Sequence, residues 1–185
     1  MADFWQRVGV PAPGEVAYHT RMALKDALLP EFDHEMGVTR RVLERVPEGD
    51  FGWKPHAKSM SLGGLATHLT NILTWTNVIT RTSDFDIAAS PPRPEVPATR
   101  AALLERFDRN VAEARALIDT TPDGELLGMW TLKHSGHIVF SMPRIAALRS
   151  FLMNHSVHHR GQLSVYLRLR DVPLPAMYGP TADEG

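Results

Sequence analysis

The most informative part of this sequence is the stretch Asn154-His155-Ser156-Val157-His158-His159-Arg160-Gly161-Gln162, because it places two histidines four positions apart. An α-helix turns by about 100° per residue, so His155 and His159 lie about 40° apart on one face. His158 lies about 60° from His155 on the other side. We therefore expect His155 and His159 to be able to share one divalent metal ion.

The apolar residues around this stretch predict which way the two histidines face. Apolar residues and both histidines follow one another at steps of three and four: Ile145, Leu148, Leu152, His155, His159, Leu163 and Tyr166. Such a stripe is typical of a helix face that packs against a core. Buried imidazoles need hydrogen-bond partners or a cation for their lone pairs. A metal ion would meet that need directly.

A third histidine interrupts a second apolar stripe between residues 61 and 80. Here His68 lies among apolar residues at helical spacing: Leu62, Leu65, Ile72, Trp75 and Ile79. Three histidines from two facing helices would leave part of the coordination sphere open, as catalytic metal sites do. The competing interpretation is that His68 is a core histidine with ordinary hydrogen bonds, because H-x-x-x-H alone is a weak motif.

The same residues resemble a known family of proteins. The resemblance rests on His155 to Gln162, on Val172-Pro173-Leu174-Pro175 and Tyr178-Gly179-Pro180, and upstream on Trp53-Lys54-Pro55-His56, Ser59 to Leu65 and Thr67-His68-Leu69. Together they are similar to the DinB-like (DinB/YfiT) family of metal-dependent enzymes, from about Phe32 to Pro180. The resemblance implies a four-helix bundle that binds zinc or nickel through His68, His155 and His159. It also implies relatives that are thiol-dependent S-transferases or isomerases, and a homodimer.

Helical patterns predict an all-α fold, a four-helix bundle with one long crossover connection. The helices are expected at about 28–46, at 59 or 61 to 82, at 99–119 and at 142–169, with a proline-rich crossover at 91–97. We expect one domain over residues 1–185, with an amino-terminal arm at 1–19 and a carboxy-terminal tail at 171–185.

Residues 129–140 depart from the helical pattern and predict a small hairpin or extended flap before the last helix. Its centre, Lys133-His134-Ser135-Gly136-His137, has the composition of a turn, so His134 and His137 are expected to face water rather than a metal. Trp53 and Trp130 are candidates either for flanking a substrate or for closing the ends of the bundle.

Candidates for a general base are few. Asp33, Glu35 and His158 are each nominated weakly, and Glu35 is equally explained as a salt-bridged residue at the edge of its helix. Arg160 and Gln162 point away from the face of His155 and His159. We interpret them as residues that support the ligands from outside or that contact another subunit.

Composition excludes several classes of function. The chain has 185 residues, 43% of them hydrophobic and 22% charged, with a net charge of −1. This even balance predicts no nucleic-acid or anionic-membrane partner. With no apolar run long enough to span a bilayer and no signal-peptide pattern, we expect a cytoplasmic protein. No cysteine is present, so any thiol chemistry must use an external thiol.

These observations support three hypotheses for function. The first is a divalent-metal-dependent enzyme acting on a small molecule, for which the resemblance suggests thiol-dependent S-transfer or isomerisation with a low-molecular-weight thiol. The second is a metal-assisted hydrolase. The third is a stress protein that binds a metal or ligand without turnover.

Overall fold

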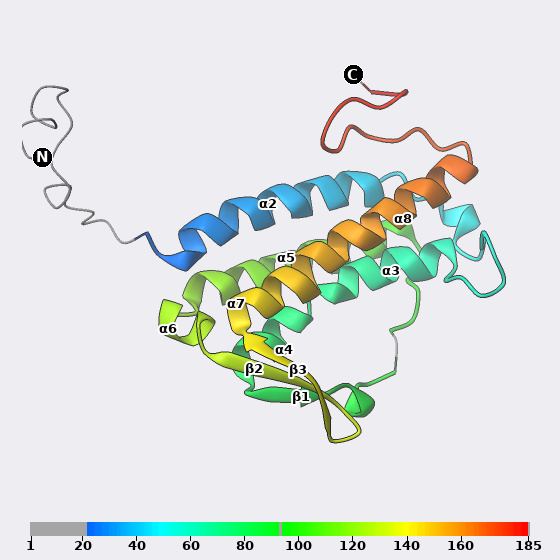
Figure 1. The fold of residues 1–185 in the computed structure, drawn as a ribbon. Coiled ribbons are helices and arrows are strands. Elements are labelled where there is room, and N and C mark those ends of the chain that lie inside the picture. The colour runs from blue at the N-terminus through cyan, green and yellow to red at the C-terminus, as the bar shows by residue number, and fades with distance from the viewer. Residues whose placement is uncertain (1–21, 93, 185) are drawn as a thin grey trace, which may run out of the picture.

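The computed structural model describes residues 22–92 and 94–184, and the predicted arm at 1–19 lies outside this range. Four long helices pack around a common core (Figure 1): α2 (Leu24–Leu43), α3 (Leu62–Ile72), α5 (Arg100–Thr120) and α8 (His155–Leu169). Helix α2 packs against α5 and α8, and α3 packs against the same two helices. Each helix contributes a fully buried side chain to the core, for example Phe32, Leu65, Phe107 and Leu163.

Local sequence explains where two of these helices begin. The Ser61 hydroxyl accepts a hydrogen bond from the Gly64 amide at 3.1 Å, and the Thr99 hydroxyl accepts one from the Ala102 amide at 3.1 Å. Both are N-caps that satisfy amides left free at a helix start. The shorter elements are η1 (Glu48–Asp50), α4 (Trp75–Arg81), η2 (Ile87–Ala89), α6 (Asp123–Leu126), α7 (Arg144–Ala147) and the π-helix η3 (Leu148–Asn154).

The prediction of an all-α fold is wrong, because the chain also forms a three-stranded mixed sheet in the order β1-β2-β3. Strand β1 (Asp84–Asp86) runs parallel to β2 (Met129–His134), which pairs antiparallel with β3 (His137–Pro143). Three residues are too few to show an alternating pattern, so β1 depends on a partner about 45 positions later in the chain. The molecule is therefore a helical bundle with a sheet added at one end (Figure 1).

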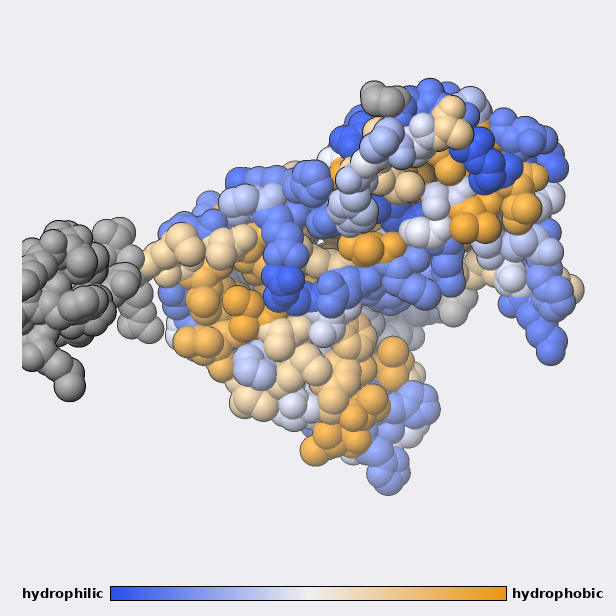
Figure 2. All heavy atoms as spheres, turned by 45° about the horizontal axis from the view of Figure 1, so that its top comes forward, coloured by the Kyte–Doolittle hydropathy of each residue, from blue (hydrophilic) through white to orange (hydrophobic). Residues whose placement is uncertain are grey.

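The hairpin of β2 and β3 turns at Ser135 and Gly136, both with positive φ angles of 50° and 80°. The carboxylate of Asp86, from the end of β1, accepts hydrogen bonds from the amides of Ser135 and Gly136 at 2.9 and 2.6 Å. These amide bonds lower the pKa of the Asp86 carboxyl. Figure 2 shows hydrophobic side chains gathered over the part of the molecule that holds the sheet, where Ile138 and Val139 of β3 are exposed.

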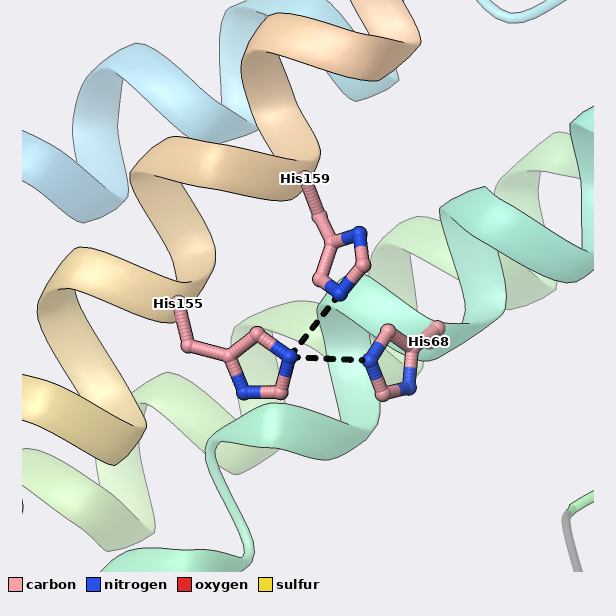
Figure 3. Close-up of side chains that lie close together, drawn as sticks. All are labelled: His68, His155 and His159. Atoms are coloured by element: carbon pink, nitrogen blue, oxygen red, sulfur yellow. Dashed lines mark hydrogen bonds between the residues drawn. The ribbon is translucent and has the colours of Figure 1, made fainter.

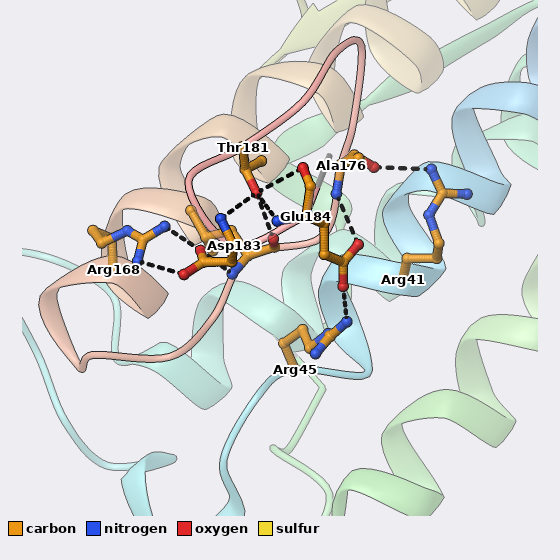
Figure 4. Close-up of polar contacts among 8 residues, drawn as sticks. Arg41, Arg45, Arg168, Ala176, Thr181, Asp183 and Glu184 are labelled. Atoms are coloured by element: carbon orange, nitrogen blue, oxygen red, sulfur yellow. Dashed lines mark hydrogen bonds and ion pairs between the residues drawn. The ribbon is translucent and has the colours of Figure 1, made fainter.

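The carboxy-terminal tail folds back over α2 and α8 (Figure 4). Arg168 pairs with Asp183 and Arg45 pairs with Glu184, while Arg41 donates a hydrogen bond to the carbonyl of Ala176. The tail also closes on itself, since the amides of Leu174 and Ala176 donate to the carboxylates of Asp183 and Glu184. The tail is thus tied to α8 by an ion pair, to α2 by the hydrogen bond of Arg41, and to the residues just after α2 by the ion pair of Arg45.

Within residues 22–92 and 94–184, no helix combines the length and the apolar character needed to cross a membrane.

Candidate metal centre

Three histidines from two helices converge in the structure (Figure 3). His68 comes from α3, and His155 and His159 come from successive turns at the start of α8. The Nε2 atom of His155 lies 3.4 Å from Nε2 of His68 and 2.8 Å from Nε2 of His159. The cluster therefore presents three ring nitrogens to one point.

The π-helix η3 lies directly before this pair of histidines. A π-helix has a wider turn than an α-helix and occurs often at functional sites. Through it the buried stripe advances in steps of four, so that it continues from Leu148 and Leu152 to Ser156 and Arg160. His155 and His159 lie beside this stripe and are only partly buried. The prediction that both occupy core positions is wrong for this reason.

Hydrogen bonds to the outer edges of the rings determine which nitrogens carry protons. Nδ1 of His159 lies 2.7 Å from the side-chain oxygen of Gln162, an acceptor that requires a proton on Nδ1. The backbone of Phe151, one turn before His155, raises the pKa of His155, as a nearby carbonyl acceptor would. The bond to Gln162 leaves Nε2 of His159 with a lone pair directed inward.

Electrostatics keep these rings neutral. Burial lowers the pKa of His155 and also that of His159, and the neighbouring imidazoles act in the same direction on both. With its Nδ1 protonated, His159 presents Nε2 as the acceptor in the 2.8 Å contact with Nε2 of His155. A cation placed between the rings would take the lone pairs of both nitrogens.

The donor set fits a divalent metal ion. Tetrahedral zinc with nitrogen ligands at about 2.0–2.1 Å would hold those nitrogens about 3.3 Å apart, close to the spacing in this cluster. Hydrogen bonds from the second ring nitrogen to an oxygen acceptor are usual for histidine ligands of metals. Three protein ligands would leave positions open, as in catalytic rather than structural sites.

The candidate general bases lie elsewhere or are committed to other partners. Glu35, on α2, is 9% exposed and accepts hydrogen bonds from Arg160 and Tyr178 at 2.7 Å each. Asp33 forms an exposed ion pair with Arg115. His158 is exposed, with its ring 4.8 Å from that of His159. Of these three candidates, only His158 lies against the cluster.

Arg160 lies in the interior of the bundle. We expected it to support the ligands from outside or to contact another subunit, yet it is 1% exposed. Its guanidinium donates to the Glu35 carboxylate, to the Glu35 carbonyl and to the Thr39 hydroxyl, and it also donates to the hydroxyl of Tyr178. The signal in the sequence was the spacing of four from Ser156, which continues the buried stripe. Gln162, in contrast, contacts a histidine of the cluster as expected.

The remaining candidates are distant from the cluster. His134 and His137 pair across the hairpin turn and are exposed, as the turn composition predicts. Trp130 is fully buried, and its indole donates to the Thr82 hydroxyl at 3.2 Å, so it packs the junction between sheet and bundle. Trp53 packs edge-on against Tyr166 at a centroid distance of 5.8 Å. Neither indole joins the three histidines.

Comparisons with known proteins agree with this fold. The chain is 23% identical over 160 residues to the uncharacterized protein YrdA of Bacillus subtilis (strain 168), covering 86% of this chain and 90% of that protein. Its fold is similar to crystal structures of two DinB-like proteins. YjoA from Bacillus subtilis has a TM-score of 0.64 at 22% identity, covering 84% of this chain and 99% of YjoA. A protein from Bacillus cereus ATCC 10987 has a TM-score of 0.63 at 19% identity, covering 84% of this chain and 98% of that one.

The likeness to these two structures concerns the fold alone, and the family follows from the sequence itself. The model of the DinB family matches residues 20–185, which include all three histidines of the cluster. This chain belongs to the DinB family.

Proposed function

We propose that this protein is a divalent-metal-dependent enzyme that acts on a small molecule. The observation that carries the proposal is the convergence of three imidazoles from two helices, whose ring nitrogens lie within 4.8 Å of one another, with Nδ1 of His159 held by the side-chain oxygen of Gln162. Burial lowers the pKa of His155 and of His159, which favours the neutral rings that bind a metal. A cation would share the three ring nitrogens, and three protein ligands leave coordination positions for a substrate.

His68, His155 and His159 would hold the ion, and zinc and nickel both suit imidazole ligands. The bound ion would supply Lewis acidity, which lowers the pKa of a coordinated water or thiol and polarises a carbonyl group. Gln162 orients the ring of His159. The partly exposed edge of the cluster, on the side of α8 away from Arg160, gives a small molecule access.

For the reaction we propose thiol-dependent group transfer or isomerisation. The support is the family membership together with the absence of cysteine from the chain, which requires any thiol to come from a cosubstrate. Metal-assisted hydrolysis is the competing reaction, because the same Lewis acid can activate water.

The test begins with protein purified without an affinity tag, whose metal content is measured by elemental analysis. Turnover is then measured with zinc or nickel, using small electrophiles with and without a low-molecular-weight thiol, and esters without thiol. We expect turnover that requires both metal and thiol. Turnover of esters without thiol would replace the proposed reaction by hydrolysis. Tight metal binding with no turnover on either set would contradict an enzymatic function.

A further inference from the structure

A cavity of about 820 Å³ adjoins the candidate metal centre, and His68 belongs to both. Its walls come from the end of α3, the start of α4, the middle of α5, and six residues after α4, namely Phe85, Ile87, Ser90, Pro91, Pro92 and Pro94. Cavities that bind small molecules usually measure about 300–1,000 Å³. The size and the shared histidine make it the natural place for the part of a substrate that does not touch the metal.

One side of the cavity suits a flat apolar group. Trp75 and Phe85 stand edge to face, with centroids 5.5 Å apart and ring planes at 82°. Pro91, Pro92 and Leu117 add further apolar surface. Aromatic pairs of this geometry readily accept a further ring against a free face or edge. An aromatic or cyclic apolar body is therefore the group that this wall would bind.

The side of the cavity formed by α5 is polar. The carbonyl of Thr70 can only accept, so Asn110, whose side chain lies 2.9 Å from it, must donate its amide nitrogen there. That leaves the side-chain oxygen of Asn110 as an acceptor. Glu113, one turn later on the same helix, adds a carboxylate, and among the described residues it has no ion-pair partner. Two acceptors one helical turn apart suit a group with several N–H donors.

Charge narrows the ligand class further. Glu113 places a formal negative charge at the wall formed by α5. An anionic end would be repelled at this wall, whereas an ammonium group would be attracted. From these contacts we propose that the cavity binds a small molecule with an apolar ring and an amino group. We also propose that such amines are the substrate class of the metal centre, and this second part rests on the function proposed above.

The first part can be tested on metal-free protein with three matched probes: 2-phenylethylamine, which is cationic at pH 7, neutral 2-phenylethanol and anionic phenylacetate. We expect calorimetric affinities in that order, with the amine about two- to fivefold tighter than the alcohol, as for a solvent-accessible charge pair. Equal affinities, or tightest binding of phenylacetate, would overturn the assignment.

Three variants test whether the probes bind in the cavity and whether Glu113 recognises the amine. Glu113→Gln should remove the advantage of the amine over the alcohol and leave the alcohol unchanged. Glu105→Gln is the matched control, because Glu105 lies on the same helix outside the cavity with its side chain 79% exposed. Ser90→Trp, at an exposed position that lines the cavity, should fill it and weaken all three probes. An amine preference that survives Glu113→Gln would refute the role of α5.

The link to the metal needs a probe that reaches both sites. N-hydroxy-3-phenylpropanamide carries a ring and a metal-binding hydroxamate, and acetohydroxamate carries the hydroxamate alone. In zinc-loaded protein we expect the ring to tighten hydroxamate binding at least about tenfold, and Ser90→Trp to abolish this gain. Equal binding of both hydroxamates would overturn the cavity as a substrate site.

The two proposals fail in different ways. If the protein takes up no metal while the metal-free amine series behaves as expected, the proposed function fails and the cavity assignment stands. If zinc binds but the amine series shows no preference, the cavity assignment fails and the metal centre stands.

Discussion

Two faces of helix α8 carry neighbouring residues with different electrostatic surroundings, Arg160 on one face and His159 on the other. Arg160 faces α2, where it brings a positive charge into the interior and meets the Glu35 carboxylate, a carbonyl and two hydroxyls. His159 faces α3, where its Nε2 meets the ring nitrogens of His68 and His155. The first face pairs a cation with an anion, whereas the second gathers three metal-binding imidazoles.

The difference separates a structural polar cluster from a candidate binding site. A buried charge that is paired with a countercharge and fully hydrogen-bonded favours one particular arrangement of helices and needs no external ligand. A convergent set of imidazole nitrogens offers ligands to a cation at its centre. Exposure follows the same division, because Arg160 is 1% exposed while the histidines remain partly accessible.

The largest expected effect is on metal binding by the histidine face. Each of His68→Ala, His155→Ala and His159→Ala should weaken zinc binding about 10³-fold, because one of three protein ligands is lost. Titration with a competing chelator measures the affinity, and circular dichroism checks that each variant folds. His134→Ala, at the exposed hairpin turn, serves as the control and should bind as the native chain does. Unchanged affinity in all three variants would remove the metal centre.

The next largest effect is on stability through the arginine face. Arg160→Met should lower the free energy of unfolding by about 3 kcal/mol, since it leaves the buried Glu35 carboxylate without its countercharge. Urea unfolding measures the loss. Arg115→Met, which breaks the exposed pair with Asp33, should cost less than about 1 kcal/mol.

If the two faces are independent, Arg160→Met should also keep zinc affinity within about threefold of the native value. A folded Arg160→Met protein with a large loss of metal would show that the two faces act as one unit.

A smaller effect is expected from the residue that orients His159. Gln162→Ala should weaken zinc binding about tenfold, the usual consequence of removing a hydrogen bond to a metal-binding histidine. Stability should hardly change because Gln162 is exposed. Gln162→Glu restores an acceptor and should recover most of the affinity. Equal affinities for all three proteins would mean that the ring of His159 is positioned by packing alone.

The smallest effect comes from Tyr178 and depends on pH. Burial raises the pKa of the Tyr178 hydroxyl, and its hydrogen bond to Glu35 acts in the same direction. A raised folded-state pKa gives stability that is fully present below the ordinary value of 10 and is lost as pH rises through the folded value. Tyr178→Phe should therefore be less stable than the native chain at pH 8, by less than about 1 kcal/mol, because the side chain is 65% exposed and water screens its hydrogen bonds.

The difference between the native chain and Tyr178→Phe should shrink above pH 10 in urea unfolding. Phenolate absorbance near the same pH should show one tyrosine fewer among those that ionise late. A constant stability difference at every pH would place the Tyr178 hydroxyl outside the network.

Much of the helical bundle could be predicted because its signals are local. The caps at Ser61 and Thr99 and the breaks near Pro47 and Pro122 are short-range features that physical chemistry translates directly into helix ends. The first helix begins at Leu24 rather than near Leu28. Pro30 therefore falls inside the helix, which tolerates the one missing backbone amide. The helix expected up to residue 82 divides into α3 and α4 around Leu73 and Thr74.

The features that escaped prediction depend on distant partners. Strand β1 forms by pairing with the backbone of β2, and the sequence Asp84-Phe85-Asp86 by itself does not predict a strand. The π-helix shifts the buried stripe by one residue, so a regular helical count assigned the histidines to the core and Arg160 to the outside. Identifying Glu35 as the partner of Arg160 needed the tertiary arrangement. The three histidines could be named because each interrupts an apolar stripe.

The parallel pairing of β1 with β2 has a consequence for the order of assembly during translation. Residues 84–86 cannot acquire their hydrogen-bonding neighbour until residues 131–133 have left the ribosome, and α5 lies between them. Pairings of such sequence separation form late and slowly. Phe85 belongs to the cavity wall beside His68. This wall therefore cannot form while only the amino-terminal half of the chain has been synthesised, and it is completed after β2 has been added.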